Sequence, residues 1–163
     1  MKLLFTIPVL CLLACNHPGQ TAQLQKQVDS LRQQLADTYK PGLGEFMTGI
    51  QVHHAKLWFA GQNENWQLAN FELNEIKESV ETIRKYYPER DESNMLLHMF
   101  NPVLDSMDHA IQQKNISVFK NTYVLLTNTC NNCHRTATFG FNIVTIPSVS
   151  PFSNQDFKVN PSK

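Results

Sequence analysis

The chain has 163 residues, and its 14 basic and 14 acidic side chains give a formal net charge of zero. Proteins that bind nucleic acids carry a basic excess that neutralises phosphates, so this balance argues against that class. Hydrophobic residues make up 42% of the sequence, which is enough for the core of a single domain. No apolar run reaches the roughly 18 residues of a membrane-spanning helix, so we expect none.

The N-terminus has the pattern of an export signal. Lys2 is followed by an apolar stretch that ends at Ala14, and this stretch is too short to cross a bilayer. Leu12-Leu13-Ala14-Cys15 resembles the lipobox of bacterial lipoproteins. The resemblance implies that residues 1–14 are a signal peptide and that Cys15 carries a lipid anchor, on the periplasmic side of a bacterial membrane. Ordinary secretion, with Cys15 as a bystander, is the alternative.

Residues 15–42 are predicted to form a polar arm and one helix. Leu24, Val28, Leu31 and Leu35 recur at spacings of four, three and four residues. This pattern covers about two heptads, fewer than the three or four that indicate a coiled coil. It suits a spacer helix, a weak seam between two copies in a homodimer, or an arm that docks on the main domain. We favour a docked helix, which Pro41 and Gly42 end.

Four further helices are predicted, over residues 43–60, 66–87 and 94–113 and from a cap at Asn115 through Cys130. Gly61 and Pro88 mark breaks, and Pro102 is expected to kink the third helix or to mark where its main part starts. The residues expected to face the core in the second and third helices are Leu68, Phe71 or Glu72, Ile76, Val80, Ile83, Tyr87, Leu96, Met99, Val103, Met107, Ala110 and Ile111.

These periods predict an all-α protein, because no window alternates with the period of two that strands require. Four amphipathic helices with short links indicate an up-down-up-down four-helix bundle over residues 43–140. The helix within residues 15–42 is extra to this bundle. Residues 141–163 contain several Pro, Ser and Asn residues and are predicted to form an irregular tail.

The chemical motif of the chain is Cys130-Asn131-Asn132-Cys133-His134, a C-x-x-C-H pattern that attaches c-type haem. Thiols three residues apart share one helix face and can form two thioethers, and His134 follows at the offset of a proximal iron ligand. A thioredoxin-like pair would need a strand before the motif, and a zinc site would need a second ligand pair. A structural disulfide would leave His134 unexplained. The motif therefore predicts one covalent haem c.

Four helices with C-x-x-C-H near the end of the last one resemble the cytochrome c′ family. The stretches His54–Ala60, Asn65–Ala69, Cys130–His134 and Pro151–Phe157 are also similar to a group of exported, cytochrome-c-like bacterial proteins. These resemblances imply haem c, a periplasmic setting and a bundle fold. The chain departs from cytochrome c′ in its lipobox, its additional N-terminal helix and its Pro-containing tail.

The second axial position of the iron decides what such a haem does. In an antiparallel bundle the start of the 43–60 helix lies beside the end of the last helix, and Met47, Gln51 and His54 share one stripe there. Met47 is nearest to the level of His134, whereas His54 is two turns, or about 10 Å, farther along. Met47 is our first choice of distal ligand and His54 the second. A five-coordinate iron is the remaining possibility.

Two functions follow from these alternatives. A second ligand favours an anchored carrier that passes single electrons between redox partner proteins. An open iron favours a haem protein that binds or senses NO or CO, which is consistent with the cytochrome c′ resemblance. An enzyme such as a peroxidase needs distal acid–base groups, and His54 with Gln51 is a weak hint of these. We therefore expect a protein without enzymatic turnover.

Overall fold

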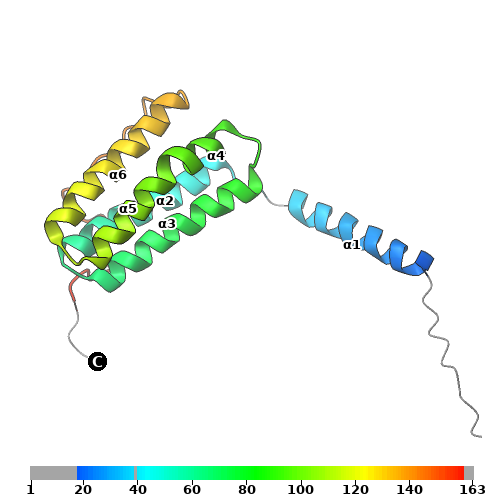
Figure 1. The fold of residues 1–163 in the computed structure, drawn as a ribbon, viewed down its shortest axis with the longest axis horizontal. Coiled ribbons are helices and arrows are strands. Elements are labelled where there is room, and N and C mark those ends of the chain that lie inside the picture. Colours follow the sequence, from blue (N-terminus) through cyan, green and yellow to red (C-terminus); the bar gives the residue numbers. More distant parts are fainter. Residues whose placement is uncertain (1–17, 39, 160–163) are drawn as a thin grey trace, which may run out of the picture. The chain divides into compact units, whose positions relative to one another are not determined.

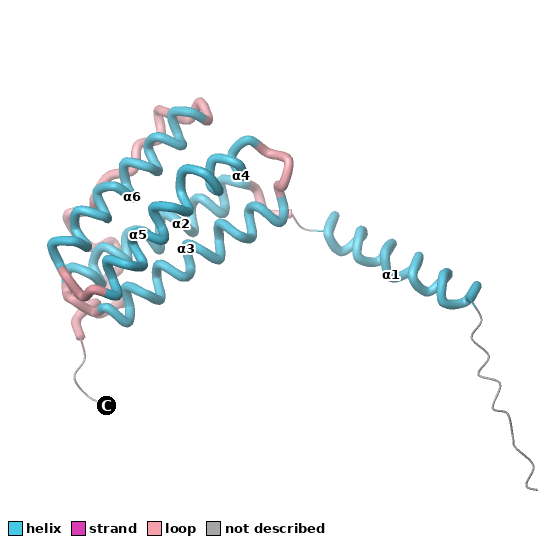
Figure 2. The backbone as a smooth tube through the Cα atoms, viewed as in Figure 1, coloured by secondary structure: helices cyan, strands magenta, loops and turns pink. Residues whose placement is uncertain are grey.

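The computed structural model describes residues 18–38 and 40–159. The expected signal peptide (residues 1–14) and the expected lipidation site at Cys15 lie outside these residues. The chain divides into two compact units, residues 1–40 and 41–163. All the regular structure in the described residues is helical and none of it is a strand, so the all-α prediction is confirmed (Figures 1 and 2).

In the first unit the structure describes one helix, α1 (Pro18–Thr38). It ends before Pro41, whose ring is incompatible with a helix interior. The four apolar side chains of the expected stripe are all exposed on α1: Leu24, Val28, Leu31 and Leu35. No helix in the described part of the chain is both long and apolar enough to cross a membrane.

The second unit is a body of packed helices. In chain order they are α2 (Leu43–Gln62), α3 (Trp66–Tyr86), α4 (Asp91–Met95), the π-helical segment η1 (Leu96–Phe100), α5 (Asn101–Gln112) and α6 (Ile116–Thr136). Helix α2 packs on α3, α3 on α5, α5 on α6, and α6 returns to α2 (Figure 1). The core includes Leu57, Leu73, Ile76, Val80, Ile83, Leu104, Met107, Phe119, Tyr123 and Leu126.

Two of the helices in the body begin at asparagine caps. Asn65 Oδ1 accepts the Leu68 backbone N–H at 3.2 Å, and Asn115 Oδ1 accepts those of Ser117 and Val118 at 3.0 and 3.1 Å. The expected cap at Asn115 is therefore confirmed. Such caps satisfy N–H groups that have no partner inside the helix.

The third predicted helix differs from expectation in its start and in its phase. It begins at Asp91 and passes through η1, where the Asn101 backbone N–H bonds to the Leu96 carbonyl five residues back. Pro102 follows directly and has no N–H to continue the normal ladder. A π turn inserts an extra residue into the helix. Phe100 and Leu104 are therefore buried where a regular period predicted Met99 and Val103, which are half-buried.

Helices α2 and α6 approach closely at one end of the body. A methyl group on Gly61 would overlap the ring of Phe119, so only glycine allows this approach. Phe119 packs against Trp58 and Tyr123, with ring centroids 6.4 and 6.1 Å apart. At the other end of the same two helices, side chains from both line a cavity.

The residues after α6 are irregular, as predicted, but they are held against the body. We call residues 139–159 the C-terminal strap. Near its start, Val144 bonds to the side chain of Asn131. Near its end, Phe157 is buried with its ring 5.6 Å from that of Phe59, and Asn65 donates to the Phe157 carbonyl at 3.4 Å. The strap thus contacts both ends of the body.

Candidate cofactor-binding site

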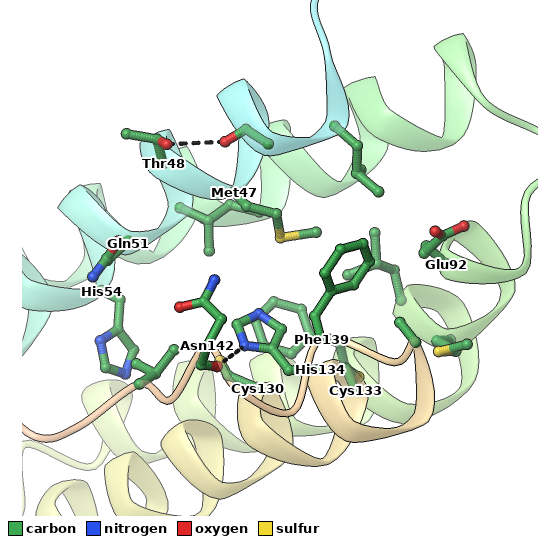
Figure 3. Close-up of a pocket in the computed structure, with 18 of the residues that line it drawn as sticks. Met47, Thr48, Gln51, His54, Glu92, Cys130, Cys133, His134, Phe139 and Asn142 are labelled. Atoms are coloured by element: carbon green, nitrogen blue, oxygen red, sulfur yellow. Dashed lines mark hydrogen bonds between the residues drawn. The ribbon is translucent and has the colours of Figure 1, made fainter.

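A cavity of about 350 Å³ lies between the N-terminal half of α2, the α4–η1 segment, the C-terminal end of α6 and the strap (Figure 3). This volume is in the range of small-molecule and cofactor sites. Its apolar walls include Leu43, Ile50, Leu96, Phe100, Ala137 and Val144. Cys130, Cys133, His134, Met47, Gln51 and His54 also line it, so the structure brings every residue considered for the haem site to one cavity.

Cys130 and Cys133 are free, half-buried thiols on α6. Burial, with a smaller contribution from the charge of Cys133, raises the pKa of Cys130 to about 12. Burial also raises the pKa of Cys133. Both groups are therefore neutral thiols at ordinary pH. A dithiol oxidoreductase works through a thiolate of lowered pKa, which these surroundings disfavour.

His134 stands at the end of α6, where the backbone turns back over it. Thr138 has a positive φ of 65°, and the Phe139 backbone N–H bonds to the His134 carbonyl at 2.7 Å. This is a Schellman motif, which closes a helix end. The His134 ring nitrogen Nδ1 lies 2.7 Å from the backbone carbonyl of Asn142. Nδ1 must donate this bond, so the neutral ring keeps its lone pair on Nε2, the nitrogen a metal can take.

Met47 and His54 occupy different places on α2. In Figure 3 the Met47 side chain points into the cavity towards His134, whereas His54 lies farther along the helix. His54 is only 3% exposed, and both of its ring nitrogens are bonded, Nδ1 to the Tyr123 hydroxyl at 2.9 Å and Nε2 to Thr127 Oγ1 at 3.0 Å. Burial lowers the pKa of His54 to about 4. Gln51, between them, is exposed and lines the cavity.

Several lining residues were not singled out from the sequence. Arg90 and Glu92 come from the link between the second and third predicted helices, and Met95 from the start of the third. Phe139 lies near the end of the predicted bundle, and Asn142 lies in the predicted tail. Arg90 donates two hydrogen bonds to Glu92, at 3.0 and 2.8 Å, and these hold the pKa of Glu92 below its usual value. The residues around Arg90, Glu92 and Asn142 have no periodic apolar pattern, so the sequence offers no signal for these three positions.

The donor side chains at the cavity limit what it could bind. Within residues 18–38 and 40–159, no three His, Cys, Asp or Glu side chains are grouped so that they could hold a metal ion by themselves. The side chains that line the cavity instead include two thiols, two imidazoles and two thioethers around an apolar space. Compared with family models, curated proteins and solved structures, the chain has no significant match.

Proposed function

We propose that this protein is an exported c-type cytochrome that carries single electrons. Cys130 and Cys133 hold one haem through thioethers, and His134 binds the iron. The helices α2, α3, α4–α5 and α6 form an up-down-up-down four-helix bundle around it. A lipid on Cys15 anchors the protein on the periplasmic side of a bacterial membrane, where redox partner proteins meet it.

One observation carries this proposal. Both thiols of the motif and His134 line a single apolar cavity, and His134 donates through Nδ1 to a backbone carbonyl. Histidines that bind metals typically donate their second ring nitrogen in this way, which fixes the tautomer and the ring orientation. A structural disulfide would account for neither the cavity nor the orientation of His134. The donor set therefore fits a haem.

When bound, the haem supplies a one-electron change between ferric and ferrous iron. The side chains of the cavity would exclude water from the haem and set its reduction potential. Leu96 and Phe100, the latter turned inward by the π turn, keep water from one wall. Leu43 and Ile50 do so from α2. A low local dielectric and a fixed axial ligand are two of the means by which a protein sets a reduction potential.

Met47 is our proposed distal ligand. Its thioether points into the cavity from the helix opposite α6 (Figure 3) and loses no proton on binding a metal. His54 would have to break a bond to Tyr123 or Thr127 before either ring nitrogen could reach a metal. Methionine and histidine together raise the potential of haem iron, which suits electron transfer.

The second candidate function is a five-coordinate haem protein that binds NO or CO. The apolar lining of the cavity favours it, because such a pocket holds a small uncharged ligand without competing hydrogen bonds. In that case Met47 would be a packing residue. Its flexible thioether suits that role as well.

The test of the haem assignment is the double variant Cys130→Ser with Cys133→Ser, produced in a bacterium that attaches haem c during export. We expect the wild-type chain to retain haem on a denaturing gel and the double variant to lose it. His134→Ala should keep the covalent haem but change its absorption spectrum, whereas the exposed His109→Ala should change neither. Haem that stays covalently bound in the double variant, or is absent from the wild type, would refute the assignment.

A separate experiment distinguishes the two functions. In the electron carrier, Met47→Ala should convert a low-spin iron to high spin, lower its potential and allow CO to bind. Met99→Ala is the matched control, because Met99 is half-buried on η1 and does not line the cavity. A wild-type iron that is already high spin and takes up CO rapidly would support the gas-binding protein instead.

A further inference from the structure

Asn131, at the first variable position of the C-x-x-C-H motif, clasps the strap. Its Nδ2 donates to the Val144 backbone carbonyl at 2.8 Å, and its Oδ1 accepts the Val144 backbone N–H at 2.8 Å. An asparagine side chain here uses both its donor and its acceptor on one residue, as a neighbouring strand would. The contact joins positions 13 residues apart and is partly buried. It therefore fixes the place and the orientation of Val144. We call this pair of hydrogen bonds the Asn131 clasp.

The same stretch of strap supplies the partner of His134. Asn142, two residues before Val144, accepts the Nδ1–H of His134 at 2.7 Å through its backbone carbonyl. The Asn142 backbone N–H bonds to the Phe139 carbonyl at 2.8 Å, inside the turn that follows α6. No helix or strand holds the strap between residues 140 and 149. Its orientation there therefore depends on the turn at Phe139 on one side and on the Asn131 clasp on the other.

We infer that Asn131 is a positioning residue for His134. It holds the strap so that the Asn142 carbonyl meets Nδ1, and thereby keeps the Nε2 lone pair of His134 directed to the cavity. The inference rests on the proposed function only in taking Nε2 as the iron ligand. The neighbouring Asn132 has a different role, because it is exposed and its side chain bonds to Arg135 on the same helix.

Loss of the clasp has two physical consequences. Without the bond to the Asn142 carbonyl, a neutral imidazole is free to place its proton on Nε2, which removes the lone pair a metal needs. When the histidine does bind, the missing hydrogen bond makes it a less basic ligand. A less basic ligand stabilises ferric iron less, so the reduction potential rises.

The test compares three variants in the full chain. Asn131→Ala removes both hydrogen bonds, Asn131→Asp keeps the acceptor for the Val144 N–H but loses the donor, and Asn132→Ala is the matched control. We expect hydrogen exchange at the Val144 amide to be about tenfold faster in Asn131→Ala, as loss of one hydrogen bond implies. Asn131→Asp should show a smaller increase, and Asn132→Ala none.

Two spectroscopic readouts separate positioning from simple loosening of the strap. In the haem-free chain, nitrogen chemical shifts of His134 should report the Nδ1–H tautomer in the wild type and in Asn132→Ala, and a shift towards the Nε2–H tautomer in Asn131→Ala. In the haem-loaded chain, the midpoint potential should move in the positive direction in Asn131→Ala and stay unchanged in Asn132→Ala. Either readout decides the question if the other form of the chain cannot be prepared.

The outcomes also separate this inference from the proposed function. If the wild type never carries haem, the proposed function fails, and the tautomer and the Val144 exchange still judge the role of Asn131. If haem is attached and Asn131→Ala changes neither the potential nor the exchange at Val144, the proposed function stands and the inference is wrong. Faster exchange with an unchanged tautomer or potential would reduce Asn131 to a structural clasp, which also overturns the inference.

Discussion

Where the C-terminal end of α2 meets the start of α6, the lack of a side chain on Gly61 sets how closely the two helices approach. Gly61 faces the ring of Phe119, which is fully buried and held by Trp58, Trp66 and Tyr123. Interiors packed this densely do not yield to added volume without strain. At the other end of the same two helices, Met47 on α2 and His134 on α6 line the cavity. Gly61 therefore sets the spacing of α2 and α6 at the end of the body opposite the cavity.

Gly61→Ala should accordingly lower the free energy of unfolding, by about 1–3 kcal/mol, since the new methyl group must displace a rigid ring. Gly49→Ala in the same helix is the matched control, because a methyl group at that position would have no neighbouring atom within 4 Å. There the better helix propensity of alanine should raise stability by about 0.5–1 kcal/mol. Urea titration of both variants gives the comparison, and equal signs would contradict it.

His54 is a second residue on which the packing of α2 against α6 depends. Its ring joins α2 to α6 through Tyr123 and Thr127, and the Tyr123 hydroxyl also donates to the His54 backbone carbonyl at 2.7 Å. Burial disfavours the charged ring, so its pKa in the folded protein is about 4 against an ordinary value of 6.5. Between these two pH values the His54 ring binds a proton in the unfolded chain but not in the folded chain.

The free energy of unfolding should therefore fall as pH is lowered from about 6.5 to about 4, with His54 contributing on the order of 3 kcal/mol over that window. Above pH 6.5 this contribution is fully present. His54→Gln should remove this part of the slope, whatever it does to stability at neutral pH. His109→Gln, at an exposed position, should retain it. Parallel pH profiles for His54→Gln and the wild type would rule out this role.

At the scale of the elements, helix ends decide where the chain is directed. Glu64, Lys114 and Thr138 all have positive φ, and each follows directly after the C-cap of a helix. Left-handed conformations cost most residues about 1–2 kcal/mol, and glycine escapes this cost. At Thr138 the β-branched side chain makes the conformation especially unfavourable, yet the turn is what folds the strap back over His134.

Thr138→Gly should stabilise the protein by about 1 kcal/mol, the strain released less the greater freedom of glycine in the unfolded chain. Thr136→Gly is the opposite case, because Thr136 is the last residue of α6 and its hydroxyl bonds to the Asn132 carbonyl at 3.0 Å. That variant should be destabilised. The midpoints of denaturant unfolding, at unchanged slope, measure both.

The elements that local chemistry determines were predictable from the sequence. Helices α2 and α3 start where expected, at Leu43 and Trp66, because glycine, proline and asparagine signals mark these ends. The choice between Phe71 and Glu72 as the inward residue was not determined by the period alone. The structure buries Glu72, which accepts a hydrogen bond from His53 at 2.7 Å, and leaves Phe71 exposed.

The candidate site was predictable to the extent that its residues are close in sequence or related by helix order. Cys130, Cys133 and His134 form one motif, and the order of the helices brings Met47 to the same cavity. The inward turn of Phe100 follows from a π insertion, which regular periodicity cannot indicate. The contribution of Asn142 comes from an irregular strap, whose course depends on long-range hydrogen bonds rather than on local preference.

For the molecule as a whole, the two units differ in how much apolar surface each one buries. The body, residues 41–163, has its own core and cavity, and the strap binds both of its ends. Helix α1 belongs to the other unit, has exposed leucines and lies a few residues after Cys15 in the sequence. This division suits a body held at a membrane through a separate N-terminal segment, as the proposed lipid anchor requires.

Cys15→Ala should therefore abolish incorporation of a labelled fatty acid, because the proposed lipid is attached to this one thiol. Cys11→Ala is the matched control, since Cys11 lies within the expected signal peptide, which the proposed processing would remove. The wild type and Cys11→Ala should partition into a detergent phase, and the chain that starts after Cys15 behind an unrelated signal peptide should appear in the periplasmic fraction. Acyl chains hold a protein by burying apolar carbon, which salt does not weaken. Release of the wild type by a salt wash alone would show that ionic contacts, and not a lipid on Cys15, keep this protein at the membrane.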